Sequence, residues 1–423
     1  MRKSKQGGFM SSPNYKRTKL ACYSAYFTMS TIFSLPPILF MIFHEMYHIS
    51  YTLLGTLVLT NFFTQLTVDL IFTFFTKYFN VQKVVKIMPL ITSAGLFIYA
   101  LTPKFFPEHA YLGLLLGTII FSISAGLSEV LLSPVIAAIP SDTPQKDMSM
   151  LHSLYAFGVF TIIIVSTVFL KLFGSENWTY LTLFLGCWPI ISSVLFMYSP
   201  MPDMNPAAEE TTHVHSTKRR AIGLALCVGC IFLGSCAENA MSNWVSSYME
   251  NALHIDKALG DLLGMAMFAI LLGLARISYA KYGKNIMRVL LFGMAGASVC
   301  YLIAGLSISP VAAFLACIFT GLCTSMLWPG TLIMMEENIP GVGVAIYALM
   351  AAGGDLGASI APQLMGIVID QVSVSNFAAE LSTTLSLTTE QIGMKAGMLV
   401  TAIFPILGTL LVLFIMRYFK KTK

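Results

Sequence analysis

The sequence predicts an all-α membrane protein with twelve transmembrane helices arranged as two pseudo-symmetric six-helix bundles. Hydrophobic residues make up 56% of the 423 residues and charged residues only 11%, too few to cover the surface of a soluble protein of this size. Long apolar runs recur along the chain, and at about 33 residues per span and loop the length accommodates roughly twelve or thirteen of them. Segments of the second half also repeat segments of the first.

Twelve apolar runs are long enough to cross a bilayer. The first follows a basic N-terminus and is too long for the apolar part of a cleavable signal peptide. The predicted spans are 20–43, 51–77, 83–102, 110–138, 150–172, 178–198, 220–250, 257–281, 285–307, 309–337, 342–371 and 393–418.

The most polar stretch of the chain separates the sixth and seventh runs. It is rich in proline and charged residues, which is typical of a linker. We therefore predict an N-terminal six-helix bundle over residues 1–198, a cytoplasmic linker over 199–219 and a C-terminal six-helix bundle over 220–423.

The orientation follows from the lysine and arginine residues of the loops. With the N-terminus inside, twenty of them fall on the inner side and four on the outer side. This bias predicts that both termini are cytoplasmic. It also supports the helix count, because one missed span would exchange the inner and outer sides for all later loops.

Two pairs of segments repeat at an offset of 195 residues. GLSEVLLSP at 126–134 matches GLCTSMLWP at 321–329, and LHSLYAFG at 151–158 matches IYALMAAG at 346–353. The offset shifts the chain by six helices, and an even shift preserves the direction through the membrane. The two halves are therefore predicted to be parallel repeats.

This layout of six plus six parallel repeats resembles the major facilitator superfamily over nearly the whole chain. Several stretches also resemble the fucose-permease-like branch of sugar:proton symporters, which implies a sugar as substrate. They are TQLTVDL, GLSEVLLSP, MSMLHSLYAFG, AENAMSNWVSSY, GDLLG, LWPG and GGDLG.

One departure from the family pattern affects the expected gate. The signature G-x-x-x-D-R-x-G between the second and third helices is absent, and the chain has FTKYFNVQK there. The gate that this loop builds in the family is thus in doubt, and Asp69, seven residues before the expected aspartate, is the candidate to replace it.

Glu129 is the strongest candidate for proton coupling. It lies about ten residues from the inner end of its helix, roughly 15 Å into the membrane, and the matching residue of the repeat is Thr324. Placing an ionisable group at this depth raises the free energy of membrane insertion by at least about 2.5–3.5 kcal/mol, so its presence calls for an explanation. It is either a proton acceptor or a carboxyl kept neutral by burial and bonded to a neighbouring helix.

The seventh span carries a polar and aromatic set that suits sugar recognition. Glu238, Asn239, Asn243 and Trp244 fall within three turns, and residues three or four apart share a helix face. A carboxylate and amides can bond sugar hydroxyls, and a ring can stack on a pyranose face. The alternative for Trp244 is the aromatic belt at the outer membrane surface.

Three other residues are candidate substrate ligands. Gln65 belongs to a polar stripe that is not expected to face lipid, His152 begins the fifth span, and Trp328 stands beside Pro329. His152 is more often a structural hydrogen-bonding group than a ligand, and Trp328 has an equally plausible packing role.

A gate or latch is predicted from the remaining intramembrane charges. Arg276 is the only cation predicted to be buried in a span, so it needs a carboxylate partner. Asp355 is the first expectation and Asp69 the second.

These patterns together favour a secondary active transporter that imports a sugar or related small polar solute by proton symport. No nucleotide-binding loop, catalytic residue set or metal-ligand motif is found, so we expect neither an enzyme nor a cofactor. The coupling ion is expected to be H⁺, with Na⁺ as the alternative. The expected partners are the substrate and the lipid bilayer, and no nucleic acid. The protein is expected to be a monomer in a plasma membrane of the bacterial inner-membrane type.

Two alternatives remain open at this point. One is an antiporter that exports drugs or metabolites, although its cavity should be more uniformly apolar. The other is a membrane sensor or scaffold that carries no flux.

Overall fold

The computed structural model describes residues 14–75, 78–202, 218–339 and 344–420, and within these residues every regular element is a helix. The first half contains six long helices. They are α1 (Lys16–Tyr47), α2 (Tyr51–Phe75), α3 (Val81–Phe105), α4 (Ala110–Ala138), α5 (Pro144–Phe173) and α6 (Trp178–Met197).

The second half is less regular, because several of its spans are divided into segments. Its elements are α7 (Lys218–Ser247), the π-helical turn η4 (Tyr248–Ala252), α8 (Lys257–Leu259), the π-helical η5 (Gly260–Ala266), α9 (Met267–Tyr282), α10 (Ile286–Leu306), α11 (Pro310–Thr324), α12 (Leu327–Asn338), α13 (Val344–Ser373), α14 (Asn376–Leu385), α15 (Thr389–Thr401) and α16 (Ile403–Lys420).

Several helices begin at residues that cap them. The Asn80 side chain accepts a backbone N–H at the start of α3, and Ser309 does the same for α11, where Pro310 takes the first helical position. Thr388 and Gln391 form a reciprocal capping box before α15. Polar residues at the ends of apolar runs therefore fix where these helices start.

The prediction of twelve spans is confirmed. Twelve helical segments are long and apolar enough to cross a membrane, and their bounds differ from the predicted ones by a few residues. The predicted linker lies mostly outside the described residues, since 203–217 are not described.

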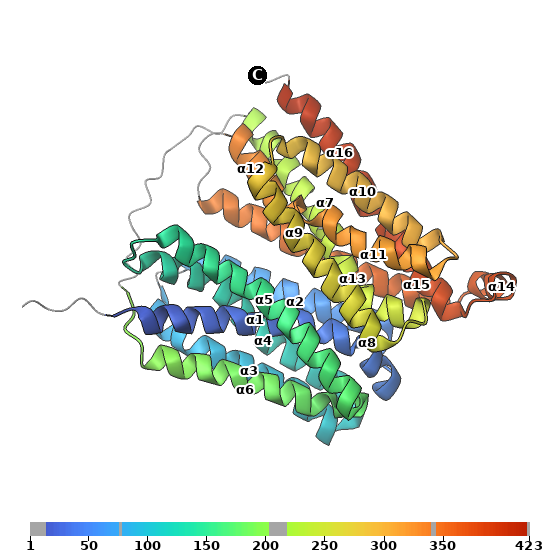
Figure 1. Cartoon of the computed structure of the whole chain (residues 1–423), viewed down its shortest axis with the longest axis horizontal. Coiled ribbons are helices and arrows are strands. Elements are labelled where there is room, and N and C mark those ends of the chain that lie inside the picture. The colour runs from blue at the N-terminus through green and yellow to red at the C-terminus, as the bar shows by residue number, and fades with distance from the viewer. Residues whose placement is uncertain (1–13, 76–77, 203–217, 340–343, 421–423) are drawn as a thin grey trace, which may run out of the picture.

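The helices form two groups, α1–α6 and α7–α16 (Figure 1). The groups lie close together near α8 and diverge toward the end at which α1 begins and α16 ends. We call these the closed end and the terminal end. The main packing between the groups is α2 against α13, and smaller contacts join α1 to α7 and α5 to η5.

Carboxylates of the second half hold the N-terminus of α2 at the closed end. Asp370 accepts the backbone N–H groups of Tyr51 and Thr52, at 3.1 and 2.6 Å. These N–H groups have no partner within their helix, and the helix dipole favours a negative charge there. Glu390 bonds the hydroxyl of Tyr51 and lies 3.2 Å from Nε2 of His44. This network joins α13 and α15 to α1 and α2.

A second polar junction joins α5 to the other half. Thr167 Oγ1 lies 3.5 Å from Oδ2 of Asp261, and Lys171 Nζ lies 3.7 Å from Oδ1 of Asp256. Asp261 is fully buried, and its charge is compensated in part by Lys257 at 3.9 Å. The closed end is therefore tied on both sides of the molecule.

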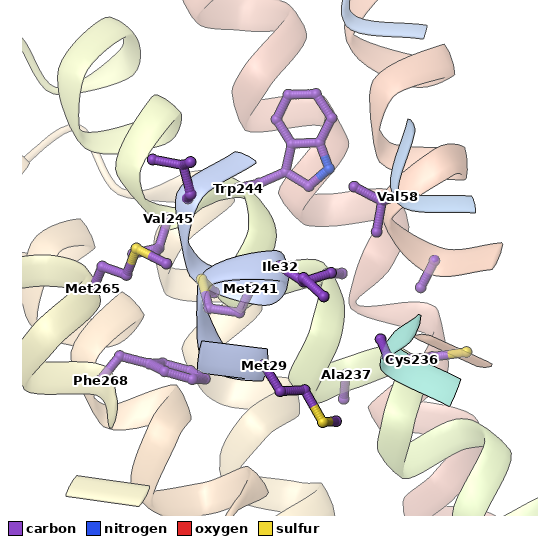
Figure 2. Packing of buried hydrophobic residues seen from close by; sticks show 14 of the residues in the cluster. Met29, Ile32, Val58, Cys236, Ala237, Met241, Trp244, Val245, Met265 and Phe268 are labelled. Carbon is purple, nitrogen blue, oxygen red and sulfur yellow. The ribbon is translucent and has the colours of Figure 1, made fainter. Parts of the chain in front are cut away.

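An apolar layer between α1 and α7 separates the closed end from the terminal end. Figure 2 shows Met29 and Ile32 of α1 beside Met241 of α7, with Trp244 one turn further along α7, and all four side chains are buried. The indole N–H of Trp244 donates to the carbonyl oxygen of Pro362 at 3.0 Å. We call these four side chains the apolar seal, because the layer crosses from one half to the other.

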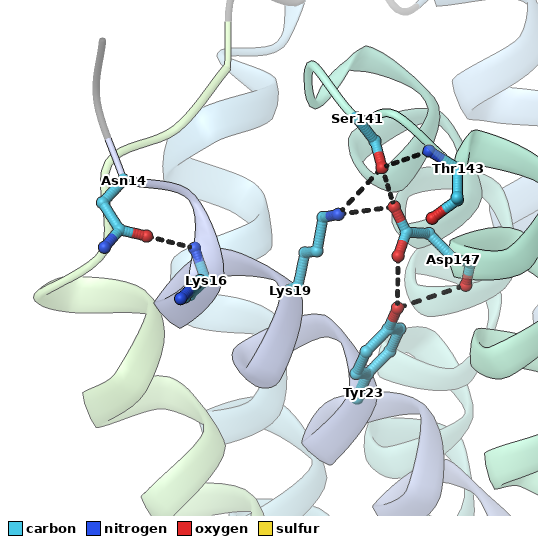
Figure 3. A network of polar contacts seen from close by, with 7 residues as sticks. All are labelled: Asn14, Lys16, Lys19, Tyr23, Ser141, Thr143 and Asp147. Atoms are coloured by element: carbon cyan, nitrogen blue, oxygen red, sulfur yellow. Dashed lines mark hydrogen bonds and ion pairs between the residues drawn. The ribbon is translucent and has the colours of Figure 1, made fainter. Parts of the chain in front are cut away.

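At the terminal end, a polar network ties α1 to the start of α5 (Figure 3). Asp147 accepts bonds from Lys19, Ser141 and Tyr23. The ammonium group of Lys19 holds the pKa of the Asp147 carboxyl below its usual value. These contacts lie within the first half, so they brace that half and do not bridge to the other.

We expect Asp147→Asn to lower the free energy of unfolding by about 1 kcal/mol at neutral pH, because the ion pair is partly exposed. The carboxyl pKa is lowered by folding, so this stabilisation is complete above the ordinary aspartate value near 4 and is lost as the pH falls through the folded value. Thermal unfolding of both proteins between pH 3 and 7 checks this. A difference that does not shrink at the acid end would contradict it.

Candidate functional site

Polar side chains from both halves gather on the terminal side of the apolar seal. The first half contributes α1, α2, α4 and α5, and the second contributes α7, α9 and α13. The two bundles diverge here (Figure 1).

Glu129 projects from α4 into the space between the two halves. Its side chain is exposed although it lies in the middle of a transmembrane helix. It is close enough to Asp355, in the other half, for their charges to interact, and also to Asp69 on α2. The Glu129 side chain therefore faces the opening between the halves. No cation among the described residues forms an ion pair with Glu129.

Asp69 and Asp355 approach Glu129 from α2 and α13. Asp69 packs against α4 where Gly126 leaves room, since a Cβ atom at Gly126 would lie 3.2 Å from its Oδ1. That oxygen is buried without a hydrogen-bond partner. Asp355 is 8% exposed and likewise makes no hydrogen bond or ion pair within the described residues. Three carboxyl groups from both halves thus share one region without a compensating cation.

The expected pairing of Arg276 with Asp355 or Asp69 is wrong. Its Nη2 instead lies 3.5 Å from Oε1 of Glu238, and its Nε donates to the carbonyl oxygen of Ser325 at 2.8 Å. Arg276 lies on the face of α9 that is turned toward α7 and the tenth span. Its guanidinium therefore contacts Glu238 and Ser325 and not Asp355 or Asp69.

The carbonyl oxygen of Ser325 is available because of Pro329. Proline has no N–H, so the carbonyl four residues before it loses its helical partner. The tenth span is interrupted at this point, between the end of α11 and the start of α12. Arg276 therefore replaces a missing backbone hydrogen bond and holds Glu238 at the same time.

In the polar and aromatic set of α7, Trp244 belongs to the apolar seal, whereas Glu238 and Asn239 lie on its terminal side. Glu238 and Asn239 are partly exposed on the terminal side, and Asn243 is nearly buried, donating to the carbonyl oxygen of Asn239 at 2.9 Å. Trp244 is fully buried between the halves, where it packs against Phe40. It does not line the opening in this structure, so its observed role is packing.

Gln65 is also turned away from the opening. It is 2% exposed, and its amide donates to Oδ1 of Asn61 at 2.9 Å. Ser122 on α4 donates to the same oxygen at 2.7 Å. The polar stripe of α2 is real, but this part of it bonds α2 to α4.

His152 and Trp328 occupy opposite halves. His152 is exposed on α5, with Nδ1 3.2 Å from the hydroxyl of Tyr26 on α1. Trp328 is partly buried, and its ring covers Gly354 so closely that a Cβ atom there would lie 2.2 Å from it. Trp328 therefore packs on α13 one residue before Asp355.

Two tyrosines complete the region around Glu129 and were missed by the sequence reasoning. Tyr26 on α1 and Tyr155 on α5 both lie within range of its charge. Their rings contact each other, with centroids 6.1 Å apart. In sequence they stand in apolar runs like any packing aromatic residue, so no local signal distinguishes them.

The region can bind a small polar solute and hold protons. Glu129, His152 and Tyr26 offer acceptor and donor groups from one half, while Glu238 and Asn239 face them from the other. A solute between them would contact both halves on the side that is open at the terminal end.

Comparisons with solved structures agree on the fold. The chain is similar to a bacterial homologue of the human lysosomal transporter Spinster in an inward-facing, unoccupied conformation, with a TM-score of 0.73 and 13% identity over 97% of this chain and 98% of that one. It is similar to a D-xylose-proton symporter, with a TM-score of 0.69 and 15% identity over 93% and 97%. For the nucleoside transporter NupG the values are 0.65 and 15% over 96% and 98%.

The family model gives the same answer from sequence. No curated protein matches the chain, but the model of the Major Facilitator Superfamily matches residues 21–362. With twelve spans in two bundles and transporters as structural neighbours, the protein is a transporter by family and fold and not an enzyme. The chain therefore belongs to the Major Facilitator Superfamily.

Proposed function

We propose that this protein imports a sugar or a related small polar solute, coupled to the movement of protons. The observation that carries the proposal is Glu129, a carboxyl group without a cation partner among the described residues that faces the opening between the halves. A coupling group has to bind a proton from one side and release it to the other, and a carboxyl group that faces a changing solvent can do this.

The polar character of the opening supports a hydroxylated solute. Glu238 and Asn239 present oxygen and amide groups to it, and five of the seven motifs that resemble the fucose-permease-like branch lie in helices that contribute to this region, namely α2, α4, α5, α7 and α13. A D-xylose-proton symporter is among the similar structures, which makes a sugar a reasonable first choice of substrate.

Sidedness follows from the charge bias. With the lysine-rich loops in the cytoplasm, both termini are cytoplasmic, and the opening at the terminal end faces the cytoplasm. The closed-end network around Tyr51, Asp370 and Glu390 is then the outer gate, and it has to separate when the protein opens outward.

The test is uptake into liposomes that contain the purified protein. A panel of labelled hexoses, pentoses and nucleosides is offered with and without an inward proton gradient. We expect accumulation of a sugar above its external concentration only with the gradient. Gradient-driven expulsion would indicate an antiporter, and the absence of any flux would contradict transport.

A further inference from the structure

A lipid-facing groove on the first half lies outside the region described above. It has a volume of about 590 Å³ and is formed by α2, α3 and α4. Its walls include Phe63 and Ile71 of α2, Ile87 of α3 and Leu127 of α4. The stacked rings of Phe72 and Phe79, with centroids 4.6 Å apart, flank the part of the groove nearest the end of α2. The volume falls within the range of small-molecule sites.

The groove is mainly apolar, and its polar lining residues are Thr64, Thr67 and Lys83. Phe63 and Ile87 are 57% and 53% exposed, so large apolar side chains remain uncovered by protein. Thr67 offers no free hydroxyl proton, because its Oγ1 donates to the carbonyl oxygen of Phe63 at 2.8 Å. Lys83 is the only charged residue of the described chain that lines the groove.

Lys83 stands where the groove meets the membrane surface. It lies in the first turn of α3, and its backbone N–H is bonded to the Asn80 cap at 3.0 Å. Its side chain is exposed, and no acidic residue of the described chain pairs with it. The ammonium group is therefore free to bind an anion.

The groove is about one leaflet deep. From Lys83 to Ile91, its lining residues on α3 are eight helical steps apart, or roughly 12 Å along the axis. Half of a hydrocarbon core of about 30 Å is close to this value. A cation at the surface and an apolar channel of one leaflet below it match the two parts of a phospholipid.

We propose that this groove binds an anionic phospholipid, with one acyl chain along α2, α3 and α4 and the phosphate on Lys83. Acyl burial alone gives little selectivity, because the competing bilayer is as apolar as the groove. The preference therefore rests on the headgroup charge, and a single lysine near the surface corresponds to about fivefold enrichment over a zwitterionic lipid.

The experiment compares two lysines on the same helix. Lys86 lies one turn from Lys83 but does not line the groove, and the bond that it accepts from Ser193 uses its backbone carbonyl and not its side chain. Lys83→Gln and Lys86→Gln therefore remove the same charge at nearly the same depth. Native mass spectrometry counts the lipids that each protein retains from an equimolar mixture of phosphatidylglycerol and phosphatidylcholine.

We expect one phosphatidylglycerol to be retained about fivefold more often than phosphatidylcholine by the wild type and by Lys86→Gln, and equally often by Lys83→Gln. Ile87→Trp, which fills the groove, should reduce retention of both lipids. Equal loss in the two lysine variants, or retention unaffected by Ile87→Trp, would overturn the site. If oleate displaces phosphatidylglycerol at equal concentration, the occupant is a fatty acid and the phospholipid assignment is wrong.

Discussion

Glu129→Gln is expected to abolish gradient-driven accumulation of the substrate while leaving exchange intact. Glutamine keeps the shape and hydrogen-bonding capacity of a protonated carboxyl group but cannot release a proton. A gradient of one pH unit carries about 1.36 kcal/mol per proton, which sustains up to about tenfold accumulation in the wild type. In the variant the internal concentration should rise only to the external one.

The control for this prediction is the carboxyl group on the other half. Glu238 is held by Arg276 and is partly exposed toward the opening, so under the proposed function Glu238→Gln should weaken binding in equilibrium and exchange assays. Exchange of labelled for unlabelled substrate in preloaded liposomes separates the two effects. The assignment of coupling to Glu129 fails if Glu129→Gln still concentrates substrate when a pH gradient is applied.

Arg276→Gln is expected to reduce both transport and stability. In a Pro329→Ala background, Arg276→Gln should cost less stability. Without Arg276, the carbonyl oxygen of Ser325 loses the donor that replaces the missing N–H of Pro329. An alanine at 329 restores a backbone N–H, so the carbonyl regains a partner within its own helix. A coupling energy of about 1 kcal/mol is expected between the two substitutions.

A double-mutant cycle from thermal or denaturant unfolding measures this coupling, and the repeat provides a control. Pro134 is the matching proline of α4, and no bond from Arg276 to that helix is observed within the described residues. Pro134→Ala should therefore leave the cost of Arg276→Gln unchanged. Arg276→Lys keeps the charge but lacks the fork of donors, so it should bond Glu238 or Ser325 and not both. Identical costs of Arg276→Gln in the wild-type and Pro329→Ala backgrounds would rule out the backbone role.

The helices were predictable because each one satisfies its own backbone within the membrane. Length and hydropathy therefore locate α3 or α10 without knowledge of any neighbour, and the even offset between repeats indicates two parallel halves. The same reasoning could not find the interruption between α11 and α12, although Pro329 marks its position, because proline is also tolerated inside continuous helices such as α1 and α4.

The partners of the intramembrane polar groups were less predictable. The sequence places Glu238 and Trp244 within two turns of α7, but it does not show that Trp244 is buried in a layer with Met29 and Ile32 of α1 while Glu238 stays partly exposed. The bond from Gln65 to Asn61 is local, yet whether the pair faces the opening or α4 depends on helix rotation. The Arg276 partner was missed for the same reason.

Proton movement that accompanies substrate tests the central claim most directly. Liposomes with the purified protein are suspended in weak buffer without a pH gradient, and the external pH is recorded when substrate is added. Proton-coupled import predicts an alkaline shift outside that follows substrate uptake, disappears with a protonophore and is absent in Glu129→Gln. Substrate uptake by the wild type without any change in external pH would contradict it.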